Sequence, residues 1–340
     1  MKVTIARVVV FAPNWLGDAV MALPALDAVR REFAGKTLIL GGLSSIAPIF
    51  QERTGAAPDE ILSIDRAREV DQLKAARADG ILLLTNSFGS AWRASRSGAP
   101  ERWGYRAGGR GWLLTRGVGT PRGRVHQIQY YLDLVRGLGI HVAQEHETGA
   151  SSAPPRIDPT PATLDWADTL LVGSGLRSGS PIVGFAPGAA YGHAKQWPPE
   201  RVAQVIAALS RRGIAAVMIG TAADRGTGRA IESSLPPDAR PVNLIGRTTL
   251  RQLVGVVARC AAFVSNDSGA MHVAAALRVP VTAMFGPTDE RVTAPAGEAA
   301  VLTREVFCRP CMLRECPIDH RCMKRIEVEA VLESVISHLK

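Results

Sequence analysis

The sequence VFAP at residues 10–13 returns as GFAP at residues 184–187, and in both places an apolar run enters a loop ahead of a helical period. Each begins a series in which short aliphatic runs alternate with helix-length segments, which is typical of βαβ units around a parallel sheet. The runs expected to be strands are Arg7–Phe11, Thr37–Gly41, Glu60–Ile64 and Gly80–Leu84, then Ile182–Phe185, Ala215–Ile219, Pro241–Leu244, Ala262–Ser265 and Val279–Phe285. The expected helices include Ala19–Phe33, Ala67–Ala78, His126–Leu138, Glu200–Arg211 and Ser268–Ala276.

Two domains follow from this repetition, since 340 residues are too many for one ordinary core. The stretch from Glu145 to about Thr163 is rich in Pro, Ser and Thr, which indicates a linker. We therefore predict an α/β fold of two Rossmann-like domains, residues 1–163 and 164–340, with the last helix packing back on the N-terminal domain. Open α/β sheets bind ligands at the carboxyl ends of their strands, so the two domains are expected to face a central cleft.

Composition indicates a soluble globular protein, with 46% hydrophobic and 21% charged residues. No apolar run approaches the roughly 20 residues that span a bilayer. The start, from Met1 to Pro13, lacks a small-residue cleavage site and is interpreted as a first strand, not a signal peptide. We expect a cytoplasmic location, in which the five cysteines are reduced, metal-bound or catalytic, without structural disulfides.

The net charge of +9 is unevenly distributed. Between Trp92 and Arg124 the single acid Glu101 stands among eight arginines, which are Arg93, Arg96, Arg102, Arg106, Arg110, Arg116, Arg122 and Arg124. Arginine suits bidentate capture of phosphate or carboxylate, whereas a solvated basic loop is the simpler interpretation. No nucleic-acid recognition motif accompanies the charge, so a nucleic-acid partner is not expected.

Three segments lie where a predicted strand ends and a helix begins, the place at which such folds put their sites. In PNWLGD (13–18), Gly17 permits a tight turn, and Asp18 is either a catalytic group or an N-cap. In PGAAYGHAKQWP (187–198), Lys195 and a loop with two glycines suggest an anion cradle, because backbone N–H groups and a lysine suit a diphosphate.

The third segment is VSNDSGAMH, residues 264–272, in which Ser268 and Gly269 open a helix whose N–H groups suit a phosphate. Asp267 is expected to accept hydrogen bonds from sugar or ribose hydroxyls, or else to cap the helix. His272 lies on the following turn, where it can face a ligand. No Asp-x-Asp pair occurs in the sequence, so Lys195, N–H groups and helix dipoles must stabilise a leaving diphosphate. The absence of G-x-G-x-x-G after the first strand weighs against an NAD-dependent dehydrogenase.

Together these three segments, with Gly286-Pro287-Thr288 and the Cys308–Cys322 cluster, resemble the lipopolysaccharide heptosyltransferases of glycosyltransferase family 9. The resemblance spans nearly the whole chain and is closer to the branch that adds the second heptose of the inner core. The first-heptose branch has threonines where this chain has Ala190 and Tyr191. The resemblance implies a GT-B fold and an inverting transfer, without a cofactor, from ADP-L-glycero-β-D-manno-heptose to a heptosyl-Kdo-lipid A acceptor.

Carried onto matching positions, the resemblance implies that Asp18 is the general base and Lys195 the diphosphate ligand, both catalytic. The residues then expected at the donor are Gly17, Gly188, Tyr191, Lys195, Asp267, Ser268, Gly269 and His272. Those expected at the acceptor are Asn14, Arg102 and Arg106, since the arginines would meet a phosphorylated glycolipid in transient contact with the anionic inner membrane. An inverting displacement needs one base and no covalent nucleophile, and closure of the cleft would assemble the reaction.

Two other functions share the predicted fold. A GT-B sugar-nucleotide epimerase, or another NDP-sugar transferase, would keep the donor site without this acceptor, and a non-catalytic nucleotide-binding module would not need Asp18. The arginines argue against the epimerase and the binding module. The cysteines at 308, 311, 316 and 322, with His320 between the last two, either hold zinc or pack a loop in reduced form. Their spacing matches no common finger, and no metal is predicted.

Overall fold

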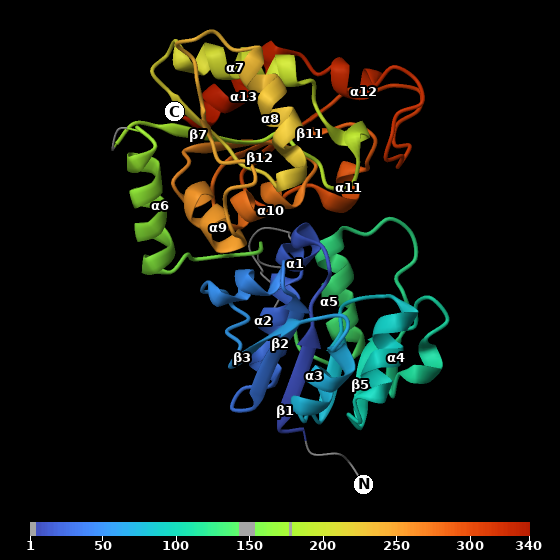
Figure 1. Ribbon diagram of the computed structural model, residues 1–340. Coiled ribbons are helices and arrows are strands. Elements are labelled where there is room, and N and C mark those ends of the chain that lie inside the picture. Colours follow the sequence, from blue (N-terminus) through green and yellow to red (C-terminus); the bar gives the residue numbers. More distant parts are fainter. Residues whose placement is uncertain (1–4, 143–153, 177–178) are drawn as a thin grey trace. The chain divides into compact units, whose positions relative to one another are not determined.

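The computed structural model describes residues 5–142, 154–176 and 179–340 (Figure 1). The chain divides into two compact units, Met1–Asp158 and Pro159–Lys340. Within each unit, helices lie on both faces of one sheet (Figure 1). No helix in the described part of the chain is long and apolar enough to cross a membrane.

The N-terminal unit has six strands, β1 (Arg7–Phe11), β2 (Thr37–Leu43), β3 (Glu60–Ile64), β4 (Gly80–Leu83), β5 (Glu101–Tyr105) and β6 (Arg116–Val118). Its helices are α1 (Leu16–Met21), α2 (Leu23–Glu32), α3 (Glu69–Ala75), α4 (Phe88–Arg96) and α5 (Gln127–Gly137), with short 3-10 helices η1 (Ala47–Gln51) and η2 (Gly111–Leu113). All neighbouring strands are parallel, in the order β3-β2-β1-β4-β5-β6. This is the Rossmann order 3-2-1-4-5-6.

The C-terminal unit also has six strands, β7 (Ile182–Ala186), β8 (Ala215–Met218), β9 (Val242–Asn243), β10 (Ala262–Asn266), β11 (Val281–Phe285) and β12 (Ala299–Thr303). Its helices are α6 (Pro161–Gly173), α7 (Pro199–Ser210), α8 (Arg225–Ser233), α9 (Leu250–Ala258), α10 (Gly269–Ala276), α11 (Glu290–Thr293), α12 (Arg321–Lys324) and α13 (Val328–His338), with 3-10 helices η3 (His193–Lys195) and η4 (Ala222–Asp224). Its parallel strands follow the order β9-β8-β7-β10-β11-β12, which repeats the Rossmann order. The predicted pair of Rossmann-like α/β domains is confirmed.

The strand order reverses once in each sheet, between β1 and β4 in the first and between β7 and β10 in the second. At such a switch point the connections leave toward opposite faces, so the loops after the two central strands diverge and leave room for a ligand. The three predicted site segments begin at these points, because 13–18 follows β1, 187–198 follows β7 and 267–272 follows β10. The fold thus puts these segments where α/β sheets bind ligands.

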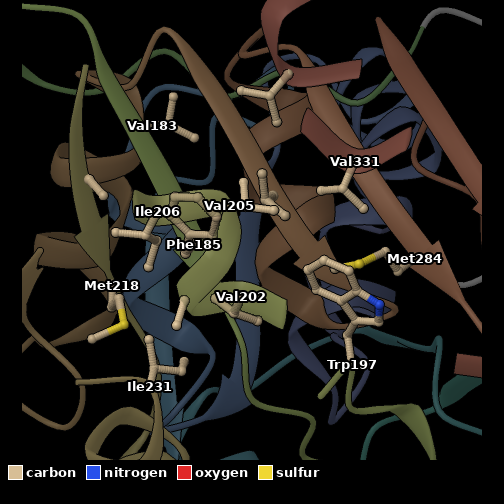
Figure 2. Close-up of a cluster of buried hydrophobic side chains, with 14 of the residues drawn as sticks. Val183, Phe185, Trp197, Val202, Val205, Ile206, Met218, Ile231, Met284 and Val331 are labelled. Carbon is tan, nitrogen blue, oxygen red and sulfur yellow. The ribbon is translucent and has the colours of Figure 1, made fainter. Parts of the chain in front are cut away.

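A core of aliphatic and aromatic side chains supports the C-terminal switch point (Figure 2). Strands β7, β10 and β11 are buried along their whole length, as expected of a parallel sheet covered on both faces. Trp197 is fully buried in this core, and its indole N–H donates to the Ile326 carbonyl at 3.1 Å. Truncating such a side chain costs about 3–5 kcal/mol. Trp197 therefore anchors the end of the loop that follows β7.

All nine predicted strands form, with bounds within two residues of those expected. The predicted helix Ala19–Phe33 is instead α1 and α2, because Pro24 near the start of α2 has no N–H to continue the first helix. Strands β5 and β6 were not expected. Nor was β12, which follows the last of the predicted strands. Strand β5 opens on Glu101 and Arg102 and β6 on Arg116, which hides the strand pattern, whereas β12 is only half-buried at every position.

The predicted linker is shorter than expected at its C-terminal end, where α6 already begins at Pro161. The Thr160 hydroxyl accepts a hydrogen bond from the Thr163 N–H, and a proline opens the helix, which together form a helix start. Residues 145–153 of the linker lie outside the described residues. The last helix, α13, packs against α7 and the strands β10, β11 and β12 of its own unit.

The arginine-rich segment is not one continuous loop, because it forms the end of α4, then β5, η2 and β6. Arg102 donates from Nε to the Leu113 carbonyl (2.9 Å) and from a terminal nitrogen to the Ala99 carbonyl (2.6 Å). Arg106 is exposed, and its side chain lies against Gly117, where a Cβ would come 2.6 Å from Arg106 Cγ. Five arginines of the segment are nevertheless exposed, as the simpler interpretation of solvated charge expects: Arg96, Arg106, Arg116, Arg122 and Arg124.

Arg110 from the same segment is fully buried. It donates to the carbonyl oxygens of Tyr105 (2.9 Å) and Thr85 (2.5 Å), and no carboxylate pairs with it among the described residues. Burial lowers the pKa of Arg110 to about 10. Its guanidinium therefore braces the loops that follow β4 and β5 and is not available to a ligand.

Arg110→Ala is expected to destabilise the N-terminal unit by about 3 kcal/mol or more, because it leaves two buried carbonyl groups without donors and opens a cavity. Urea denaturation measures this loss. Arg122→Ala is the matched control, since Arg122 is exposed in the same segment. It should change stability by no more than about 0.5 kcal/mol. Equal midpoints for the two variants would show that Arg110 does not brace these loops.

Candidate active site

One buried side chain, Asn266 at the end of β10, holds both ends of the loop that follows β7. Its amide nitrogen donates to the carbonyl oxygens of Pro187 (2.7 Å) and Gly188 (3.2 Å). Its amide oxygen accepts the backbone N–H of Trp197 at 3.0 Å. Three hydrogen bonds from one buried amide fix the loop between these points, and with it Lys195.

Lys195 forms an ion pair with Asp267, whose Oδ2 lies 2.5 Å from Lys195 Nζ. The same oxygen accepts the Thr288 hydroxyl at 2.7 Å. The side chains of Lys195 and Asp267 are 12% and 7% exposed. Asp267 does not cap α10, because Ser268 is the N-cap residue. The expectation of an N-cap at Asp267 is therefore wrong, and its carboxylate instead orients the lysine.

The ring of Tyr191 makes cation–π contacts with two side chains, those of Lys195 and Arg314. Lys195 Nζ is 4.7 Å from the centre of its ring, and Arg314 Cζ is 5.1 Å from the same ring. The Tyr191 hydroxyl donates to the Met312 carbonyl at 2.9 Å. Cation–π contacts of this kind add to the attraction between the loop after β7 and residues 312–314. Tyr191 thus links Lys195 to a segment more than 100 residues later in the chain.

The two glycines of this loop are required by close approach of protein groups. A Cβ at Gly188 would lie 2.0 Å from Asp224 Oδ1. At Gly192, where φ is 156°, a Cβ would lie 2.4 Å from the Arg314 carbonyl oxygen. Neither position admits a side chain without displacing its neighbour. The predicted anion cradle is thus closely packed against Asp224 and Arg314.

The first turn of α10 carries Ser268, Gly269 and His272. Ser268 has extended backbone angles and makes no side-chain cap bond; its hydroxyl lies 3.0 Å from that of Ser265. Gly269 is the first helical residue, and His272 is buried one turn later. The N-terminus of α10 therefore opens beside Asp267, at the switch point, where its dipole favours negative charge.

The predicted site residues of the N-terminal unit, in the segment after β1, are Asn14, Gly17 and Asp18. Asn14 is exposed just before α1, while Gly17 lies inside the helix and not in a tight turn, contrary to expectation. The N-cap of α1 is Trp15, so the expectation that Asp18 caps the helix is wrong. Burial raises the pKa of Tyr131 well above its ordinary value, and the nearby charge of Asp18 raises it further. Asp18 therefore lies close to a buried, neutral tyrosine of α5.

The five cysteines are all free. The structure shows no group of three or more His, Cys, Asp or Glu side chains arranged to hold a metal, in the part of the chain that it describes. His320 Nε2 donates to the Ala194 carbonyl at 2.6 Å, next to Lys195. The Ala194 N–H in turn donates to the Arg314 carbonyl at 2.9 Å. Through these two hydrogen bonds, residues of the 308–322 segment hold the loop that contains Lys195.

Asn266, Thr288, Arg314 and Tyr131 were not predicted as site residues. Asn266 and Thr288 stand within quoted motifs, at the end of one central strand and just after the next. For Asn266 the signal available was a polar residue at the end of a buried strand, and for Thr288 it was a polar residue in the loop after one. Nothing in the sequence pattern pointed to Arg314, which lies beside Tyr191 in the C-terminal unit, or to Tyr131, which lies close to Asp18 in the N-terminal unit.

Residues 66–321 match glycosyltransferase family 9 (heptosyltransferase). The chain belongs to this family. Lipopolysaccharide heptosyltransferase 2 of Escherichia coli K12 is 30% identical over 88% of either chain. Lipooligosaccharide heptosyltransferase 2 of Campylobacter jejuni serotype O:2 is 27% identical over 98% of either chain. The solved structure of E. coli ADP-heptose lps heptosyltransferase II has a TM-score of 0.82, with 27% identity and 98% of both chains covered.

The family resemblance inferred from the motifs is thus confirmed, together with the GT-B type of α/β fold and the class of enzyme, a glycosyltransferase. A UDP-GlcNAc 2-epimerase from Methanocaldococcus jannaschii has a TM-score of 0.51 at 10% identity, which shows a shared fold alone. The epimerase alternative is not favoured.

Proposed function

We propose that this glycosyltransferase transfers L-glycero-D-manno-heptose from ADP-heptose to the heptosyl-Kdo-lipid A inner core of lipopolysaccharide, with inversion at the anomeric carbon. The observation that carries the proposal is the Lys195–Asp267 pair beside the N-terminus of α10, in a family 9 chain. A lysine and a helix N-terminus at a switch point suit the diphosphate of a nucleotide sugar.

On the donor side, Lys195 would neutralise the charge that develops on the leaving diphosphate, with backbone N–H groups of Ser268 and Gly269. Asp267 holds the lysine in place by its ion pair, and Thr288 holds Asp267. The oriented cation needs no rearrangement when the bond to the sugar breaks. Gly17, Gly188, Tyr191 and His272 complete the proposed donor set.

On the acceptor side, Asp18 would take the proton of the attacking hydroxyl. The new bond forms from that oxygen to the anomeric carbon as the bond to the diphosphate breaks on the opposite side. No covalent intermediate is needed. Tyr131 stays neutral beside Asp18, so it adds no second negative charge near the base.

Acceptor binding is proposed for Asn14, Arg102 and Arg106. Arg106 is exposed, whereas Arg102 already donates to the Leu113 and Ala99 carbonyls. Arg106 is therefore the stronger choice for a phosphate of the acceptor. Because this acceptor carries lipid A, transient contact with the cytoplasmic face of the inner membrane is part of the proposal.

The proposed donor, ADP-heptose, is tested by comparing how strongly different nucleotides stabilise the protein. ADP is expected to raise the melting temperature clearly more than UDP or GDP at equal concentration. A ligand at 100 times its Kd adds about 2.7 kcal/mol of stability, which for a unit of this size corresponds to roughly 5–10 °C. Differential scanning fluorimetry with each nucleotide in turn measures the shift. Equal shifts, or a preference for UDP, would refute the ADP-heptose donor and leave the fold intact.

A further inference from the structure

Helix α4 of the N-terminal unit carries its large side chains on the outside. Its buried positions are the small residues Ser90, Ala91 and Ala94. Phe88 and Trp92, four residues apart on one face, are 45% and 46% exposed. Burial of a large aromatic side chain is favourable, so a helix that buries alanine and exposes phenylalanine and tryptophan is unusual for a solvent-facing element.

A third ring extends this face. Trp112 in η2 is 75% exposed, and its ring centre lies 6.2 Å from that of Phe88. We call Phe88, Trp92 and Trp112 the aromatic patch. Contiguous exposed aromatic residues from two segments mark an interaction surface more often than isolated exposed residues do.

The charge around the aromatic patch is positive. Arg96 lies with its Cζ 5.8 Å from the centre of the Trp92 ring. The side chain of exposed Arg106 lies against Gly111, the residue before Trp112. The one acid between residues 80 and 132 is Glu101, whose Oε2 accepts the Trp103 indole N–H and the Thr115 hydroxyl. Helix α3 packs against α4, and its Glu69 pairs with Arg93 of that helix. In the described part of the chain no ion pair engages Arg96 or Arg106, so these two arginines keep the patch positive.

The aromatic patch lies at the same end of the N-terminal sheet as Asp18. Helix α4 begins at the carboxyl end of β4, and η2 follows the carboxyl end of β5. Strand β4 pairs in parallel with β1, whose own carboxyl end leads to Asn14 and Asp18. A partner on the patch would therefore approach the edge that carries the proposed base.

We propose that the aromatic patch, with Arg96 and Arg106, docks this chain on the headgroup region of an anionic phospholipid bilayer. Tryptophan and phenylalanine favour the interface between water and lipid, and arginine favours anionic headgroups. The charge complementarity selects this occupant over a second copy of the chain, which is itself basic. The inference deepens the proposed function, since an embedded acceptor would be presented at the Asp18 edge.

The test uses co-sedimentation of the full chain with vesicles of phosphatidylcholine alone, or of phosphatidylcholine with phosphatidylglycerol. Wild type is expected to bind the anionic vesicles more strongly, and less so as salt is raised. Trp92→Ser with Trp112→Ser should lower that binding about tenfold or more. Both side chains are exposed, so the melting temperature should stay close to that of wild type.

Phe307→Ser is the matched control, because Phe307 is 78% exposed with Arg321 Cζ 5.0 Å from its ring centre, in the other unit. It should bind vesicles like wild type. Equal binding by the double variant, or none by wild type, overturns the docking surface. So would a concentration-dependent dimer of wild type that the double variant loses while vesicle binding is unchanged.

Heptose transfer to a deacylated, water-soluble acceptor separates this inference from the proposed function. The double variant should match wild type on that acceptor and be slower on vesicle-embedded acceptor. Equal impairment on both acceptors overturns docking, because the patch would then act on the sugar or on folding. If wild type transfers no heptose yet binds vesicles through the patch, the proposed function fails and the docking surface stands.

Discussion

Asp18→Asn is expected to lower kcat for heptose transfer about 100-fold or more, the usual scale for a positioned base, with ADP affinity nearly unchanged. Asparagine keeps the shape and the hydrogen bonding of the side chain but cannot take the proton of the attacking hydroxyl. Asp18 belongs to the N-terminal unit, whereas Lys195 and Asp267 belong to the C-terminal unit. Its loss should therefore leave the lysine and carboxylate proposed at the diphosphate in place.

Steady-state kinetics and ADP titration calorimetry together measure this separation. Asp27→Asn is a matched control, since the Asp27 carboxylate on α2 lies in an exposed ion pair with Arg31. Such a pair contributes at most about 1 kcal/mol, and kcat should not change. Near wild-type transfer by Asp18→Asn, or a defect confined to nucleotide binding, would contradict the assignment. A loss of stability alone is not expected, because Trp15 and not Asp18 is the N-cap of α1.

Lys195→Met is expected to weaken ADP binding about 10- to 100-fold, the equivalent of one charge-assisted hydrogen bond. It should lower kcat further, to the extent that charge on the diphosphate grows in the transition state. The variant also leaves the Asp267 carboxylate, 7% exposed, without its cation. An unpaired buried charge destabilises the unit and repels a diphosphate.

The double variant Lys195→Met with Asp267→Asn tests this second effect. Removing the carboxylate should restore part of the lost stability and part of the ADP affinity, so that the two substitutions are not additive. Thermal unfolding with and without ADP gives both quantities. Lys324→Met, an exposed lysine of α12, is the control and should behave like wild type. An unchanged Kd for ADP in Lys195→Met would remove Lys195 from the donor site.

The sequence by itself determined the α/β class, the presence of two Rossmann-like domains and nine of the twelve strands found in the described residues. It did so because parallel strands buried on both faces are short continuous apolar runs, which local pattern detects. It also put Asp18, Lys195 and Asp267 in the segments that follow central strands, since strand and helix order alone define those junctions. The family followed from three such motifs in series.

Only the tertiary structure decided how these residues are held. Lys195 and Asp267 are 72 residues apart in sequence, and the Asn266 amide reaches back 79 residues to Pro187. Periodicity reports local geometry and says nothing about such contacts. The same limit explains Arg110, which the sequence grouped with exposed arginines but whose buried guanidinium donates to carbonyl groups at the end of β5 and just after β4. The pairing of Lys195 with Asp267 and the burial of Arg110 depend on separate strands that end side by side. That arrangement exists only once the sheet has formed.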